Sequence, residues 1–137
     1  MNRKLITRMM GWLGTVKVLH WQAPRATNAH ETLGELYDGM EGLLDRFAES
    51  VFAKTGDSTV PADSLVLEPG TGYADLLRTG TALVSEMRRD ARSWEQQAGD
   101  NDDLVNLLAD MSQEITDATY WLEVKVRSGG EDEESEI

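Results

Sequence analysis

Apolar residues recur along most of the chain at the three- and four-residue steps that place side chains on one side of an α-helix. Four such stretches occur, over residues 5–19, 33–51, 76–94 and 104–122. Their apolar stripes are Leu5, Met9, Trp12, Val16 and Leu19; Leu33, Tyr37, Met40, Leu44, Phe47 and Val51; Leu76, Leu77, Leu83, Val84, Met87, Ala91 and Trp94; and Leu104, Leu108, Met111, Ile115, Ala118 and Leu122. The sequence has no strand or hairpin signature, so the pattern predicts four amphipathic helices and an all-α fold.

Turn-forming residues set the expected limits of the first two helices. Pro24 ends the first helix, because a proline ring clashes inside a helix. Asn28 opens the second, since Glu31 three residues later has the spacing of a capping box, and this helix should continue to about Lys54. Residues 55–70 contain two prolines and no helical period, which predicts a loop.

The limits of the other two helices follow in the same way. The third is expected to begin near Thr71 or Gly72. Residues 99–103 supply a stop for the third helix and N-cap candidates for the fourth. The fourth should end at Gly129 and Gly130.

The lengths of the connections limit how the helices can pack. Only a few residues join the first helix to the second and the third to the fourth, so each pair must be antiparallel neighbours. Residues 55–70 span about 50 Å if extended, more than the roughly 38 Å of a 25-residue helix. The sequence therefore predicts a ferritin-like four-helix bundle over residues 1–127, with one long crossover between the second and third helices. A helical hairpin pair that opens into a dimer is the alternative fold, and the acidic tail, residues 128–137, is expected to be disordered.

Composition and charge narrow the range of functions that the chain could have. The chain has 137 residues, no cysteine and a net charge of −12. Without cysteine, disulfide scaffolds and thiolate metal sites are excluded, and we expect a cytoplasmic protein. An acidic surface repels phosphate backbones, and no apolar run approaches 18 residues. These features argue against binding to DNA and against a membrane span.

The two histidines are the first candidates for chemistry. His20 lies in the last turn of the first predicted helix, and His30 lies in the first turn of the second. A tight hairpin would bring both imidazoles to one spot. Two ordinary surface or capping histidines are the alternative interpretation.

Two carboxylates on the second helix are the remaining candidates. Asp45 and Glu49 are four residues apart and share one face. Asp45 is about 22 Å along the helix from His30, so the two cannot hold one metal ion within a chain. If two copies of the second helix cross antiparallel on a twofold axis near residue 38, His20 and His30 of one chain face Asp45 and Glu49 of the other. Two identical sites then form in a homodimer.

Three glycines in the second helix fit such a crossing. Each glycine costs a helix interior about 1 kcal/mol, and close approach of two backbones is one reason to keep Gly34, Gly39 and Gly42. The nitrogen and oxygen donors of the expected site suit iron, zinc or manganese better than calcium.

These residues resemble the Dps mini-ferritins. The similar segments are Leu19-His20-Trp21-Gln22, Ala29-His30-Glu31, Asp45-Arg46-Phe47-Ala48-Glu49 and Asp117-Ala118-Thr119-Tyr120-Trp121-Leu122-Glu123. They follow the order and spacing of the family over the first two helices and the last. The chain is also similar to short Dps-like proteins encoded by tailed phages, which share the HWQ segment and the pair Tyr37-Asp38.

The resemblance implies a subunit of a hollow shell of twelve that stores and detoxifies iron. It implies a ferroxidase that oxidises Fe(II) with peroxide or oxygen between subunits. His20 and His30 of one chain and Asp45 and Glu49 of its partner would be the catalytic metal ligands, with Trp21 beside them.

Two departures from the family pattern open an alternative. Gly34 stands where mini-ferritins usually have an aspartate, so a ligand for a second iron is missing. The lysine-rich N-terminal tail that many Dps proteins use on DNA is also absent. A non-enzymatic ferritin-like assembly module, with a degenerate or single-metal site, is therefore the second functional hypothesis.

Other features receive simpler interpretations. Residues 1–30 carry five basic residues and no acid, so contact of the first helix with nucleic acid or membrane is a third hypothesis, although its apolar stripe suits the bundle core.

The methionines at helical spacing are expected to fill the core. These are Met9, Met10, Met40, Met87 and Met111. Asp100, Asp102 and Asp103 are expected to cap the fourth helix or to steer cations.

Overall fold

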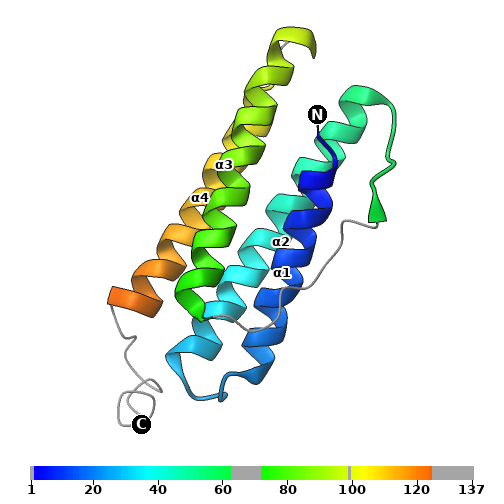
Figure 1. Cartoon of the computed structure of the whole chain (residues 1–137). Helices are drawn as coiled ribbons and strands as arrows, with labels where there is room; N and C mark the ends of the chain where they lie inside the picture. Colours follow the sequence, from blue (N-terminus) through cyan, green and yellow to red (C-terminus); the bar gives the residue numbers. More distant parts are fainter. Residues whose placement is uncertain (1, 63–71, 99, 125–137) are drawn as a thin grey trace.

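The computed structural model describes residues 2–62, 72–98 and 100–124 (Figure 1). Within them the chain forms four α-helices and one short π-helix, and no strand. The elements are α1 (Lys4–Gln22), α2 (Asn28–Thr55), α3 (Tyr73–Ala98), α4 (Asp102–Thr119) and the π-helix η2 (Tyr120–Val124). The prediction of an all-α bundle of four helices is confirmed. Gly99, residues 63–70 of the predicted loop, Gly129, Gly130 and the acidic tail lie outside the described residues.

Each helix is antiparallel to the two helices that it contacts most. Along the α1–α3 contact, the indole nitrogen of Trp12 donates to the main-chain oxygen of Leu76 (2.8 Å), and Arg8 pairs with Glu86 (3.3 Å). Residue numbers therefore fall in one helix as they rise in the other. The same reversal holds for α1 with α2, which meet at Arg3 and Thr55 and at His20 and His30. It also holds for α2 with α4, through Asn28 with Trp121 and Lys54 with Asp103, and for α3 with α4 (Figure 1). Consequently α2 and α3 run in the same direction, as Figure 1 shows.

The predicted stripes form the core. The side chains of Met9, Met40, Met87 and Met111 are fully buried. The ends of the stripes, Leu19, Trp94 and Leu122, are partly buried and pack against this core. Full burial of each large apolar side chain contributes about 1.5–3 kcal/mol. The apolar face of α1 is occupied by this packing, which disfavours its use as a membrane or nucleic-acid surface.

The expected ends of α1 and α2 are close to those observed. Ala23, directly before Pro24, has an extended backbone (ψ 136°), the conformation that a following proline favours. Gly56 adopts a left-handed conformation (φ 70°) and ends α2 with a bond from its N–H to the oxygen of Phe52 (2.8 Å). A glycine is favoured there because it has no Cβ.

The predicted capping box at Asn28 is wrong by one residue. Thr27 is the N-cap of α2, and its hydroxyl accepts a hydrogen bond from the N–H of His30 (3.3 Å). The amide of Asn28 instead donates to the main-chain oxygen of Trp121 (2.7 Å). Asn28 is buried, and this hydrogen bond joins the start of α2 to η2.

The prediction that Met10 fills the core is also wrong. Met10 is 54% exposed, whereas its neighbour Met9 is fully buried. One residue rotates a helix by about 100°, and this turns Met10 away from the core.

The start of α4 is capped by the side chain of Asp100. Its carboxylate accepts the N–H of Asp102 (2.9 Å), and Asn101 occupies the N-cap position. Asp103 is engaged by Ser50 and by Lys54 (3.1 Å). The capping interpretation therefore fits Asp100, while Asp103 joins α4 to α2.

Gly80 of α3 leaves room for the buried indole of Trp12. A Cβ at position 80 would lie 2.7 Å from indole Cε2. Gly80→Ala is expected to destabilise the bundle by about 1–3 kcal/mol, the usual cost of overpacking a core, although alanine is the better helix former. Denaturant unfolding followed by circular dichroism measures this change.

Gly72→Ala is the matched control, because a Cβ there would meet nothing within 4 Å. It should alter the free energy of unfolding by less than about 0.5 kcal/mol. Wild-type stability of Gly80→Ala would contradict the tight fit against Trp12.

Candidate functional site

The two histidines meet at the hairpin between α1 and α2. His20 belongs to the last turn of α1, and His30 lies in the first turn of α2, where the Thr27 cap fixes the backbone. Their rings stack with centroids 4.0 Å apart and planes inclined by 29°. Both residues are half-buried. The structure therefore brings together the two imidazoles that the sequence placed at one spot.

Each imidazole is held by the main chain of the opposite helix. Nδ1 of His20 donates to the oxygen of His30 (2.6 Å). Nδ1 of His30 donates to the oxygen of His20 (2.8 Å) and lies 3.1 Å from that of Ala23. A nitrogen that faces a carbonyl oxygen must carry the proton. The geometry thus selects the Nδ1–H tautomer for both rings when they are neutral.

The other ring nitrogens are suited to bind a metal. In a neutral Nδ1–H imidazole, Nε2 carries a lone pair. Within the described part of the chain, no protein group hydrogen-bonds to Nε2 of His20 or of His30. Metal-bound histidines usually donate their second nitrogen to a carbonyl or carboxylate, which fixes the ring. The hairpin supplies this support for both rings.

Gly34 makes room for the ring of His20. A Cβ at this position would lie 2.7 Å from Cε1 and 3.1 Å from Nδ1 of His20. The aspartate that mini-ferritins usually carry there is therefore incompatible with this placement of the imidazole. Gly34 and the position of the His20 ring are therefore two aspects of one arrangement.

Asp45 and Glu49 lie far along α2 from the histidines. Both are exposed, and about 22 Å of helix separates Asp45 from His30. Among the described residues, no group of three or more histidines and carboxylates could hold a metal ion. One chain therefore supplies two separate halves of the predicted donor set.

The other two glycines of α2 have different surroundings. A Cβ at Gly39 would lie 2.6 and 2.7 Å from the carboxylate oxygens of Glu114, so the glycine leaves a notch for this α4 side chain. A Cβ at Gly42 would meet nothing within 4 Å. The expectation that close approach of a second copy of α2 explains the three glycines stays a prediction; within the chain, Gly34 and Gly39 accommodate the side chains of His20 and Glu114.

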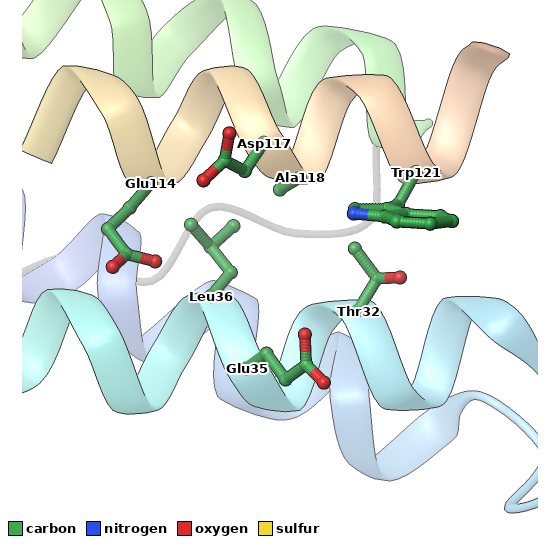
Figure 2. Close-up of a pocket in the computed structure, with 7 residues that line it drawn as sticks. All are labelled: Thr32, Glu35, Leu36, Glu114, Asp117, Ala118 and Trp121. Atoms are coloured by element: carbon green, nitrogen blue, oxygen red, sulfur yellow. The ribbon is translucent and has the colours of Figure 1, made fainter. Parts of the chain in front are cut away.

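An acidic pocket between α2 and α4 was not anticipated from the sequence. Figure 2 shows Glu114 pointing from α4 toward α2, with Glu35 on α2 and Asp117 on α4 around the same space. The pocket has a volume of about 180 Å³, and the indole of Trp121 closes one end. The one available signal was Gly39, a helix-interior glycine that needed a packing reason.

The surroundings of Glu114 favour its protonated form. Burial raises the pKa of its carboxyl, and the negative charges of Asp117, Glu35 and Asp110 raise it further. The pocket thus disfavours a negative charge on Glu114.

Comparison with known proteins does not assign this chain to a family. No family model, curated protein or solved structure matches the chain. Across the three described segments, none of the helices combines the length and apolar character that crossing a membrane requires.

Replacing Glu114 with glutamine tests the electrostatics of this pocket. A carboxyl with a raised pKa holds its proton more tightly in the folded protein than in the unfolded chain. Its contribution to stability therefore falls as the pH rises above 4.5, the ordinary value for glutamate. Glu114→Gln should be more stable than wild type at pH 7 by a few tenths of a kcal/mol, the size expected for partly screened charges.

Urea unfolding from pH 4.5 upward measures this difference, which should shrink toward the acid end. Glu123→Gln is the control, because Glu123 is exposed and lies outside this pocket. A Glu114→Gln protein with a stability gain independent of pH would contradict the assignment.

Proposed function

We propose that the chain is a Dps-like mini-ferritin with a ferritin-like bundle, which binds and oxidises Fe(II) at sites formed between two subunits of a hollow homo-oligomer. It would thereby store and detoxify iron. The observation that carries the proposal is the reciprocal hydrogen bonding of His20 and His30, which leaves the Nε2 lone pair of each ring for a metal ion.

The position of α2 supports donation from a partner subunit. One side of α2 packs against α1 and α4, so the opposite side is available to a second copy. Asp45 and Glu49 are exposed on this helix. In an antiparallel crossing near residue 38, the two carboxylates of each chain approach the histidines of the other. Both subunits then contribute the same residues to two equivalent sites.

The helix directions support the ferritin-like part of the proposal. Because α2 and α3 run in the same direction, the chain between them has to connect opposite ends of the bundle. One long crossover of this kind distinguishes ferritin-like bundles from simple up-and-down bundles.

The proposed donors suit ferrous iron as a substrate. Imidazole nitrogen binds Fe(II), and carboxylate oxygen stabilises the additional positive charge of Fe(III). Two ferrous ions supply the two electrons that reduce one hydrogen peroxide molecule to two hydroxide ions, and two ferric ions result. His20 and His30 hold the ion, and Asp45 and Glu49 of the partner subunit favour its oxidised form. Zinc or manganese fits the same donors.

Gly34 favours a second candidate function. A ligand at this position conflicts with the observed ring of His20, so each site has donors for one ion. A ferritin-like assembly module, with a single structural metal and without ferroxidase activity, would have this geometry.

Anaerobic titration with Fe(II), followed by absorbance after addition of peroxide, separates the two functions. Rapid and stoichiometric formation of Fe(III) is expected. The double variant Asp45→Asn with Glu49→Gln should slow it at least about tenfold, because the partner's charged donors are lost. Asp110→Asn, an exposed acid on α4, is the control and should retain the wild-type rate. An intact oligomer that oxidises iron no faster than buffer would contradict the ferroxidase and favour the assembly module.

A further inference from the structure

We propose that the acidic tail, residues 128–137, docks on the outer side of α3 in the same chain. The inference goes beyond the proposed iron chemistry and does not depend on it. Three observations carry it: the charge on the outer side of α3, a groove beside this side, and the point at which α4 and η2 end.

The outer side of α3 forms a basic line. Its exposed positions follow one another at steps of four and three residues. They are Arg78, Ala82, Ser85, Arg89 and Arg92. Glu86 and Asp90, which belong to the same stretch, are engaged by the first helix and its N-terminal residue. Glu86 pairs with Arg8 (3.3 Å), and Asp90 accepts the main-chain N–H of Asn2 (2.6 Å). The basic line itself contains three guanidinium groups and no carboxylate.

Two of these arginines are available to bind an anion. Arg78 pairs with Asp75, one turn earlier on α3. Across the parts of the chain that the structure describes, Arg89 and Arg92 form no ion pair. A guanidinium group presents several N–H donors to a carboxylate. The basic line is therefore suited to bind a run of acidic side chains.

The other helices are less suited to bind an acidic segment. The stretch from residue 102 to residue 124, which forms α4 and η2, contains six acids and no basic residue. The exposed carboxylates of α2 likewise repel negative charge. Two basic residues of α1 are already engaged, since Arg8 pairs with Glu86 and Lys17 lies over the ring of Tyr37 (4.4 Å). Charge thus directs an acidic segment to α3.

An open groove lies between the start of α3 and the end of α4. It has a volume of about 440 Å³ and is lined mainly by apolar atoms, with Leu77 and Ala82 on α3 and Thr119 on α4. Arg78 and Glu123 are its charged lining residues. Because Arg78 and Ala82 also belong to the basic line, the groove leads directly onto it.

The tail begins next to this groove. Ser128 follows Glu123, a lining residue, by five positions. The tail contains five acids and no basic residue; the acids are Glu131, Asp132, Glu133, Glu134 and Glu136. The residues that follow Val124 can span about 45 Å if extended, whereas Arg78 and Arg92 are about 21 Å apart along α3. The tail is therefore long enough to reach the whole basic line.

Two glycines permit the change of direction that this path requires. The last helical turns end beside the start of α3, and α3 and α4 are antiparallel (Figure 1). A chain that leaves η2 must consequently turn back before it can follow α3. Gly129 and Gly130 precede the acids, and glycine adopts turn conformations that other residues disfavour.

The covalent connection makes weak ion pairs sufficient for docking. A short flexible tether gives its end an effective concentration on the order of millimolar at a site within reach. Each exposed ion pair needs to add little to this advantage. The docked tail neutralises the basic line and closes it to other polyanions.

Disulfide formation between two introduced cysteines tests this contact, because the chain has no cysteine of its own. Ser85→Cys places one thiol among the arginines, and Ser135→Cys places the other in the tail. Oxidation of the full chain with diamide at low ionic strength should give a disulfide within one chain. Mapping of proteolytic peptides by mass spectrometry and non-reducing electrophoresis identify this product.

Removal of charge should slow the reaction of this cysteine pair. Replacing the four acids of residues 131–134 by their amides is expected to lower the rate at least about tenfold, since electrostatic attraction raises local concentration by at least this factor. Arg89→Gln with Arg92→Gln should lower it in the same direction, and 0.5 M salt should do so by screening, because the Debye length falls below about 8 Å. Circular dichroism verifies that each variant is folded.

The pair Glu41→Cys with Ser135→Cys is the matched control. Glu41 is exposed on α2, about 20 Å along that helix from Asn28, which contacts the end of the last helix. Ser85 is about 17 Å along α3 from Ala74, which lines the groove. The tail can reach both positions, so slow reaction at residue 41 is expected from the negative charge of α2.

Three outcomes would overturn the inference. Equal rates for the two cysteine pairs would show that the tail samples both helices without docking. A rate that does not change when the acids or the arginines are neutralised would show that charge does not direct the tail. A disulfide that forms between two chains would show that the tail docks on another copy.

Discussion

The exchange of hydrogen bonds between two stacked imidazoles and the main chain is the interaction on which the proposed chemistry depends. His20 and His30 each donate Nδ1–H to the carbonyl oxygen of the other residue. This closes the α1–α2 hairpin, selects one tautomer for both rings and leaves both Nε2 lone pairs for a ligand. Gly34 is required by the same contact, because any Cβ there would collide with His20. The glycine at this position is thus part of what holds the two imidazoles in place.

Periodicity predicted the fold well because burial of one face decides where these helices lie. The stripes of apolar residues became the core, and Pro24 ended α1 as expected. Details that depend on a partner in space were not predictable. Thr27 rather than Asn28 is the N-cap, and the side chain of Asn28 instead bonds the main chain of Trp121, which is 93 residues away. Met10 is a different case: it faces outward because one residue rotates a helix by about 100°, which follows from the apolar stripe through Met9.

For the candidate site, too, the sequence predicted the placement of the residues but not their contacts. The sequence placed both histidines at one hairpin, and the structure brings them within stacking distance. It also predicted the separation from Asp45 and Glu49, which follows from helix geometry alone. The sequence did not predict the reciprocal hydrogen bonds of the two rings or the acidic pocket around Glu114. Both depend on which rotamers pack across a helix interface, and no local pattern specifies that choice.

The central claim is that two subunits share each metal site, and mixing complementary variants tests it most directly. One variant lacks both imidazoles (His20→Asn with His30→Asn), and the other lacks both distal carboxylates (Asp45→Asn with Glu49→Gln). Each should fail to oxidise Fe(II) alone. After the two are unfolded and refolded together, a mixed dimer contains one complete site, so random pairing should restore about a quarter of the wild-type sites. No recovery from folded mixed dimers would contradict a site shared between subunits.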